Sequence, residues 1–174
     1  MKKYEVSIPV IVSTLENHSN IKASLLELIE REQKISYDSI SKTDWNISLD
    51  FDRDYVKIFT ENAYSHMKNI FFDLGYSKFE IKNIWFQQYE KNSFHHWHLH
   101  SGVDFTNVYY LELPSTELIT QIKNPMNFNE FVKINVNEGD ILTMPGHIVH
   151  RSPKNLFGER KTVISFNCNV DFPR

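Results

Sequence analysis

Four of the protein's eight histidines fall within six consecutive positions, at His95, His96, His98 and His100. Side chains in a β-strand alternate between its two faces, so the three histidines at even positions would share one face. Trp97 and Leu99 would then occupy the other face. A strand with imidazoles on one side and apolar groups on the other suits a divalent metal site inside a β-barrel.

Several choices of metal ligand are open. His98 and His100 form one pair on the shared face, and His96 with His98 is a rival pair. His150, fifty residues further on in the phrase PGHIVH, is the candidate for a distant third ligand. His147 and His150 differ by an odd number of positions, so only one of them can face the metal from a regular strand. The alternative is that these histidines form an ordinary solvated face.

The segment 160–170 predicts a strand with two unlike faces. The even positions after Arg160 carry Thr162, an isoleucine, a phenylalanine and a cysteine, and are more apolar than the odd positions. The even face should therefore point into the barrel, with Arg160 and Thr162 at its inner mouth and Lys161 in water. A buried guanidinium is costly unless it is paired, and it binds carboxylates in a bidentate manner. Arg160 therefore predicts an acidic ligand, unless an acid on a neighbouring strand pairs with it.

The elements that would position these residues follow Gly75. Turn residues separate eight short β-type runs, which is typical of a β-sandwich or barrel. These runs are 79–90, 94–100, 105–113, 117–122, 130–136, 140–144, 147–152 and 160–170. Before them, 4–12 predicts an edge strand because of Pro9. Apolar residues at helical spacing predict helices over 18–33 and 52–74, which we expect to pack on the outer face of one sheet.

The segment 34–51 has no clear period and lies between the two predicted helices. It contains Trp45 and Ile47, whose apolar side chains would stay exposed to water in a disordered segment. Long loops in compact domains are usually functional or disordered. We therefore expect this loop to fold towards the metal and to shape a substrate pocket with Trp45.

Composition narrows the class of protein. The 174 residues suit one domain, with 1–78 as an N-terminal strand and helical support and 79–172 as the β core. The net charge of −3 argues against a nucleic-acid partner. A single cysteine, Cys168, excludes an intramolecular disulfide and fits a reducing compartment. No apolar run approaches the length of a membrane span and no signal peptide is evident, so we expect a soluble cytoplasmic protein. Nothing in the sequence indicates the oligomeric state.

The spacing of these residues resembles that of the Fe(II)- and 2-oxoglutarate-dependent oxygenases, in particular the prolyl-4-hydroxylase-like branch. Gln88-Tyr89 followed by His98 is similar to the first metal strand of that family. His150 followed ten residues later by Arg160 resembles its distal metal histidine and the basic residue that holds the far carboxylate of the co-substrate. The combination of HxH, YYLELP and ERKTVISFN also resembles a phage and bacterial subgroup. The resemblance covers about residues 80–170.

The resemblance implies a double-stranded β-helix, also called a jelly-roll or cupin-like fold, with N-terminal helices on its major sheet. It implies a dioxygenase that uses Fe(II), 2-oxoglutarate and O2 to hydroxylate a C–H bond of a small-molecule or peptide substrate. The metal ligands would be His98, His100 and His150. The co-substrate would be bound by Arg160, Tyr89, Thr162 and Tyr110.

Two positions depart from the family pattern. The second ligand is usually Asp or Glu where this chain has His100, so either three histidines bind the metal or Asp104 replaces His100. Asn92 stands where the branch commonly has glycine, and asparagine tolerates a left-handed backbone. Three-histidine dioxygenases that use no 2-oxoacid, and a non-catalytic β-helix binding module, are therefore rival interpretations.

Overall fold

The computed structural model describes residues 2, 4, 7–47 and 52–173. Its elements in chain order are β1 (Ile11–Thr14), α1 (His18–Arg31), β2 (Ile35–Tyr37), β3 (Ile40–Thr43), α2 (Asp54–Asp73), β4 (Lys78–Tyr89), β5 (His95–His98), β6 (Phe105–Glu112), a 3₁₀ turn η1 (Thr116–Leu118), β7 (Gln121–Asn124), β8 (Asn127–Val132), β9 (Asp140–Pro145), β10 (His150–Ser152) and β11 (Lys161–Asp171).

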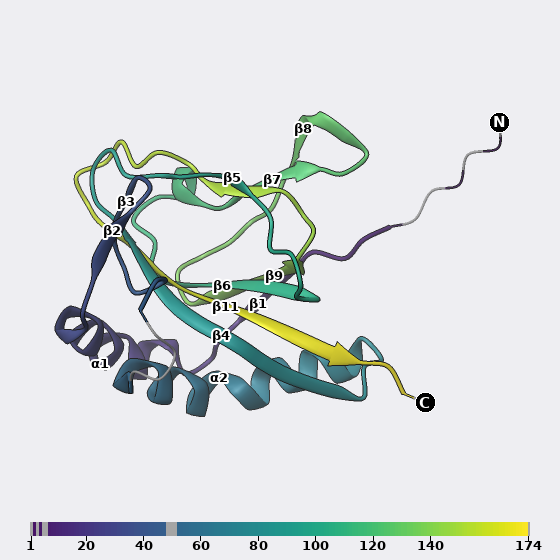
Figure 1. The fold of residues 1–174 in the computed structure, drawn as a ribbon, viewed down its shortest axis with the longest axis horizontal. Coiled ribbons are helices and arrows are strands. Elements are labelled where there is room, and N and C mark those ends of the chain that lie inside the picture. The colour runs from purple at the N-terminus through teal and green to yellow at the C-terminus, as the bar shows by residue number, and fades with distance from the viewer. Residues whose placement is uncertain (1, 3, 5–6, 48–51, 174) are drawn as a thin grey trace.

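Two antiparallel sheets face each other, and both helices lie on the outer side of the larger one (Figure 1). The larger sheet has seven strands in the order β1-β9-β6-β11-β4-β3-β2, and the smaller has four in the order β5-β10-β7-β8. Each of the eight predicted runs after Gly75 contains or overlaps a strand. The prediction of a mainly β protein with two helices is confirmed.

The N-terminal half differs from the prediction in two places. The edge strand begins only at Ile11, after Pro9, and pairs with β9. The segment 34–51 is not a loop throughout, because β2 and β3 form a hairpin that joins the edge of the larger sheet. Residues 48–51 of the predicted loop lie outside the described part of the chain.

One hydrophobic core lies between the helices and the larger sheet. Helix α1 buries Ile21, Leu25 and Ile29 at intervals of four residues, and α2 buries a stripe at the same interval, as an amphipathic helix requires. The Phe59 ring of α2 packs at 5.3 Å from the ring of Tyr109 and 5.4 Å from that of Phe166. Helix packing thus fixes one face of strands β6 and β11.

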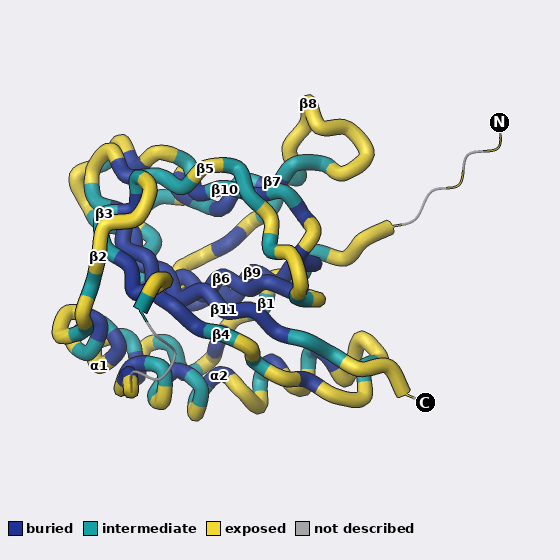
Figure 2. The backbone as a smooth tube through the Cα atoms, viewed as in Figure 1, coloured by how far each residue is buried: buried dark blue, intermediate teal, exposed yellow. Residues whose placement is uncertain are grey.

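A second hydrophobic core lies between the two sheets. It contains Tyr89, Tyr110, Leu142 and Val163 of the larger sheet and Ile122 of the smaller one. Strand β11 is buried on both faces, because it lies centrally in the larger sheet between the two cores (Figure 2). In the described part of the chain, neither helix is long and apolar enough to cross a membrane.

Candidate metal centre

Three imidazoles meet at the inner face of the smaller sheet. His98 of β5 lies directly opposite His150 of β10, and His100 follows the end of β5. One ring nitrogen from each histidine lies within 4.8 Å of the others. The ring centroids are 4.3 Å apart for His98 and His150, and 5.2 Å apart for each pair that includes His100. The arrangement can therefore hold one metal ion.

Backbone carbonyls orient two of these rings. Nδ1 of His98 donates a hydrogen bond to the carbonyl of His96 at 2.7 Å, and Nδ1 of His150 donates to that of Ile148 at 2.9 Å. Each bond places the proton on Nδ1 and leaves Nε2 as the free lone pair. Metal-binding histidines are commonly oriented in this way, by a hydrogen bond from the nitrogen that does not bind the metal.

The environment keeps the three rings uncharged. Burial, together with the neighbouring His98, lowers the pKa of His150 to about 3 and that of His100 to about 4. Burial also lowers the pKa of His98. Because only a neutral imidazole binds a metal, the group is ready to bind one at neutral pH.

The three even-numbered histidines of this segment do not all share one face, as a regular strand would require. His150 pairs with His98, but Ser152 pairs with His95, so β5 has one extra residue and forms a bulge. The bulge turns His95 inwards, where its ring stacks on that of His98 at 4.0 Å. The His96 side chain is 66% exposed and lies 3.4 Å from an Asp38 carboxylate oxygen. The prediction that His96 shares the face of His98 was wrong.

Gly146 holds the His100 segment against the turn that precedes β10. Its carbonyl accepts a hydrogen bond from the His100 N–H at 2.8 Å, and its N–H donates to the Asp104 carbonyl at 2.9 Å. A Cβ at this position would lie 2.6 Å from the carbonyl oxygen of Val103, so only glycine fits. The Asp104 carboxylate is exposed and accepts a hydrogen bond from the Val170 N–H, which keeps it outside the group of three histidines.

Lys161, not Arg160, is the basic side chain that points between the sheets. Lys161 is 1% exposed and lines the narrow inner cavity beneath the three histidines. Its Nζ donates to the Leu118 carbonyl at 2.7 Å and to Oγ of Ser152 at 2.9 Å, and lies 5.0 Å from the centroid of the Tyr89 ring. Burial, with no opposing carboxylate in the described residues, lowers the pKa of Lys161 to about 7.

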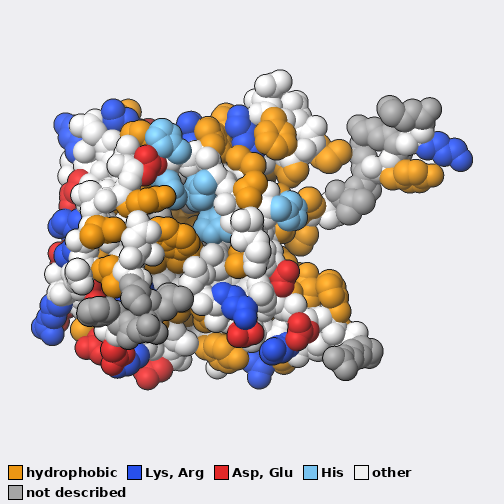
Figure 3. Space-filling model, in the orientation of Figure 1, with side chains coloured by type: hydrophobic (Ala, Val, Ile, Leu, Met, Phe, Trp, Pro, Cys, Tyr) orange, Lys and Arg blue, Asp and Glu red, His pale blue; other side chains and the backbone are white. Residues whose placement is uncertain are grey.

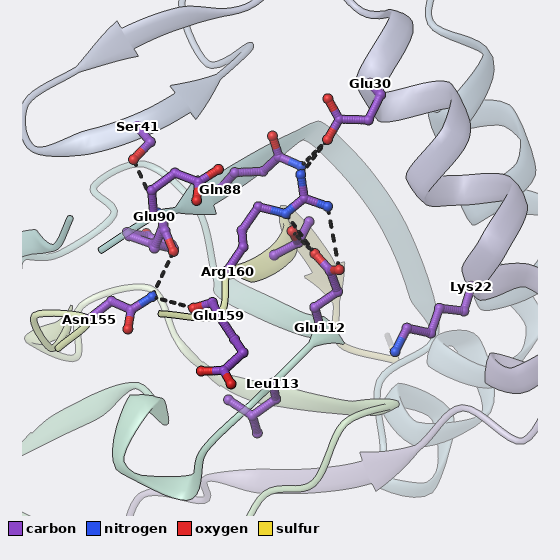
Figure 4. A network of polar contacts seen from close by, with 12 residues as sticks. Lys22, Glu30, Ser41, Gln88, Glu90, Glu112, Leu113, Asn155, Glu159 and Arg160 are labelled. Atoms are coloured by element: carbon purple, nitrogen blue, oxygen red, sulfur yellow. Dashed lines mark hydrogen bonds and ion pairs between the residues drawn. The ribbon is translucent and has the colours of Figure 1, made fainter. Parts of the chain in front are cut away.

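Arg160 lies on the helix side of the larger sheet. Its guanidinium bonds the carboxylates of Glu112 on β6 and Glu30 on α1 (Figure 4). Thr162 also donates to Glu112, and Glu30 additionally accepts from Gln88. The predicted orientation of this strand was wrong: the even positions face the helices, and an acid on a neighbouring strand pairs with Arg160.

The two tyrosines predicted to bind the co-substrate both lie in the inner core. Tyr89 lies opposite Lys161 in the β4–β11 ladder and lines the inner cavity. Tyr110 donates its hydroxyl proton to Oγ1 of Thr120 at 2.8 Å and lies with its ring centroid 5.6 Å from Lys161 Nζ. Burial raises the pKa of Tyr110 to about 12, so it stays a neutral hydrogen-bonding group.

An open cavity of about 370 Å³ lies over His98 and His100. In Figure 3, histidine side chains gather in a hollow of the visible face, beside hydrophobic side chains. Trp45 lines this cavity and packs edge-on against Trp85 at 4.4 Å, and Trp85 stacks on His100 at 5.8 Å. The predicted approach of Trp45 to the mouth of the site is confirmed.

The residue before Trp45, Asp44, is held in place by its buried carboxylate. Asp44 is 1% exposed and accepts hydrogen bonds from Arg53 at 2.7 Å, from the Tyr55 hydroxyl at 2.6 Å and from the Phe86 N–H at 2.8 Å. These donors come from the start of α2 and from β4. The chain at Trp45 is therefore anchored to both the helix layer and the sheet.

Several solved structures resemble this chain in fold at low sequence identity. A 2OG-Fe(II) oxygenase family oxidoreductase from Burkholderia pseudomallei has a TM-score of 0.69 and 10% identity, over 92% of this chain and 84% of that one. A Pseudomonas putida prolyl-4-hydroxylase has a TM-score of 0.64 and 13% identity, over 97% and 95%. The chain has the fold of the 2-oxoglutarate and iron oxygenases.

The same oxygenase fold occurs in HygX from Streptomyces hygroscopicus, a structure with nickel, 2-oxoglutarate and hygromycin B bound. Its TM-score is 0.69 at 10% identity, over 93% of this chain and 83% of that one. No family model matches this chain, and no curated protein matches it in sequence. The likeness therefore concerns the fold, and the three-histidine group has to be argued from this chain alone.

Proposed function

We propose that the protein is an Fe(II)- and 2-oxoglutarate-dependent dioxygenase with a double-stranded β-helix core over residues 79–172. His98, His100 and His150 would hold the iron. The bound iron would supply O2 activation coupled to oxidation of 2-oxoglutarate to succinate and CO2, and a C–H bond of the substrate would be hydroxylated. The observation that carries the proposal is the group of three neutral imidazoles, with one ring nitrogen of each within 4.8 Å of the others, of which His98 and His100 line an open cavity.

Lys161 is the proposed partner of the far carboxylate of 2-oxoglutarate. It lines the inner cavity with all three histidines, whereas Arg160 is engaged by two glutamates on the other face of the sheet. A lysine without a carboxylate partner is a natural anion site in a confined space. The inner cavity is narrow, about 20 Å³. An extended diacid would therefore enter through the open cavity of about 370 Å³ over His98 and His100, called the outer cavity below, and would displace side chains to reach Lys161. Tyr89, beside Lys161, would line the path.

The absence of a carboxylate from the metal group bears on the chemistry. Among the described residues the group contains only histidines, and Asp104 is bonded to the backbone elsewhere. Three neutral ligands leave the full double positive charge on the metal, which favours a dianionic co-substrate. The same ligand set also occurs in dioxygenases that use no 2-oxoacid, so dependence on 2-oxoglutarate is the deciding property.

The neighbouring structures support a small-molecule or peptide substrate, since one contains hygromycin B and another is a prolyl-4-hydroxylase. The buried thiol of Cys168 has no cysteine partner, and we place the enzyme in the reducing cytoplasm.

The test uses thermal shift with Mn(II), followed by N-oxalylglycine, an unreactive mimic of 2-oxoglutarate. We expect Mn(II) to stabilise the protein and N-oxalylglycine to add a further shift only when metal is present. Iron-dependent O2 consumption without any 2-oxoacid would favour the three-histidine dioxygenase. No metal-dependent shift would support a non-catalytic binding module.

A further inference from the structure

Two amide side chains at the floor of the outer cavity have unused hydrogen-bonding capacity. Asn83 of β4 and Asn167 of β11 lie opposite each other in the ladder, and both line the cavity beside His100. Within the described residues, neither Oδ1 has a partner at hydrogen-bonding geometry, although the Asn167 side chain lies next to the His100 ring, and Asn167 is only 4% exposed. Buried acceptors without partners are rare in proteins and destabilising.

Two other amide side chains near the larger sheet have partners for their oxygens. The side chain of Asn107, on the opposite face of the larger sheet, donates to the Phe166 carbonyl at 3.1 Å and accepts from Thr143 at 2.7 Å. Gln87, also at the cavity, accepts from the Ser165 hydroxyl at 3.1 Å. A third unpartnered oxygen among the described residues, Oε1 of Gln88, lies on the helix side, where Gln88 Nε2 donates to Glu30, so Asn83 and Asn167 are the two that line the outer cavity.

The outer cavity is electrically neutral along its described walls. Its lining contains no aspartate, glutamate, lysine or arginine. An ammonium or carboxylate placed there would lose its hydration without gaining a counter-charge from these walls. The described walls therefore select against charged groups, apart from an anion that binds the metal itself.

One wall of the outer cavity is aromatic. Trp45, Trp85 and Tyr37 line one side, and the two tryptophan rings meet edge-on at 4.4 Å. Flat apolar groups pack well against such rings. Because opposite residues of an antiparallel pair lie about 5 Å apart, one group with two donated protons can bridge the two Asn oxygens.

We propose that this part of the cavity is a subsite for an uncharged, flat group that donates two hydrogen bonds, of the carboxamide class, and that the substrate is recognised through it. The inference rests on the proposed function, since it is the metal beside His100 that would make the bound molecule a substrate. The aromatic wall would pack on the plane of the group, and Asn83 and Asn167 would accept its N–H protons.

The test uses four benzene derivatives that differ in charge or in hydrogen-bond donors: benzamide, benzamidinium, benzoate and N,N-dimethylbenzamide. Binding is followed by tryptophan fluorescence and calorimetry in protein loaded with Zn(II) and 2-oxoglutarate. We expect benzamide to bind at least tenfold more tightly than each of the others. Equal binding of benzamidinium, or of the dimethyl compound that lacks both donors, would overturn the proposal.

A variant that changes which probe is preferred distinguishes loss of the subsite from misfolding. Asn83→Asp should turn the preference from benzamide to benzamidinium, a gain that an unfolded variant cannot show. Asn129→Asp, at an exposed position of β8, is the matched control and should leave the order of the four probes unchanged. Unchanged preference in Asn83→Asp would overturn the subsite.

The outcomes separate this inference from the proposed function. The amide pair and the tryptophans need no metal, so benzamide should also be preferred by the metal-free protein. If Zn(II) and 2-oxoglutarate bind but benzamide is not preferred, the subsite is wrong and the proposed function stands. If benzamide is preferred but no metal binds, the proposed function is wrong and the subsite is a binding site only.

Discussion

Replacing Lys161 by methionine should weaken 2-oxoglutarate binding and stabilise the free protein at the same time. Methionine fills a similar volume without the charge. Burial lowers the pKa of this lysine from 10.5 to about 7, which at about 1.4 kcal/mol per pKa unit corresponds to about 5 kcal/mol of destabilisation below pH 7. The two hydrogen bonds of Nζ offset part of it. We expect a net gain of about 1–3 kcal/mol, in line with replacements of other buried charges.

The effect on the co-substrate has the opposite sign. Loss of a confined charge pair is worth about 2–5 kcal/mol, so the affinity for 2-oxoglutarate should fall at least about 30-fold, while metal affinity is unchanged. Denaturant unfolding measures the first effect, and calorimetric titration of the Mn(II)-loaded protein measures the second. Arg160→Ala, one residue away, is the control. A larger loss of 2-oxoglutarate binding in Arg160→Ala than in Lys161→Met would refute the assignment.

The pH dependence follows from the same lysine. In the free protein, Lys161 loses its proton above about pH 7. A bound anion favours the charged lysine, so binding should take up a proton. The affinity for 2-oxoglutarate should therefore fall as the pH rises above 7. Stability changes in the other direction. Between about pH 7 and 10.5 the unfolded chain keeps the proton that the folded chain has lost, so stability should rise with pH. Both trends should disappear in Lys161→Met, and their persistence there would assign them to another group.

The remaining predictions concern four other features. Arg160→Ala should lower the free energy of unfolding by about 1 kcal/mol, measured with urea, because its partners lie in a half-exposed ion-pair network. His100→Ala should abolish tight Mn(II) binding by calorimetry, whereas Asp104→Ala should retain it; the reverse pattern would make Asp104 the ligand. Trp45→Ala should leave metal and 2-oxoglutarate affinity within about twofold but weaken benzamide binding, as fluorescence titration would show. Gly146→Ala should weaken metal binding, because its Cβ would collide with a carbonyl 2.6 Å away and displace the His100 segment; unchanged affinity would mean that this segment is not held there.

Alternation and spacing in the sequence were sufficient to predict the β core and both helices, whereas the choice of His98, His100 and His150 came from the family resemblance. The predicted helices 18–33 and 52–74 differ from the observed ones by one or two residues at their ends. Asn92 does adopt a left-handed backbone, with φ of 73°. These features depend on local patterns, which a single sequence displays.

The orientation of β11 could not be predicted in the same way. Hydrophobic alternation tells the inner from the outer face only when one face meets water, and β11 is covered by helices on one side and by the smaller sheet on the other. Arg160 and Lys161 therefore both contact other parts of the protein, and their partners come from segments distant in the sequence. The bulge that exchanges His95 for His96 depends on pairing with β10, which is equally invisible in the sequence.

The anchoring of Trp45 has a consequence for how the substrate range could change. Three donors hold the Asp44 carboxylate in the interior, while the Trp45 side chain next to it is 39% exposed and contacts the cavity wall. Backbone position and side-chain identity are therefore separable at this point of the chain. Directed evolution that varies residue 45 while keeping Asp44, Arg53 and Tyr55 should yield folded proteins with differently shaped entrances over the same metal group.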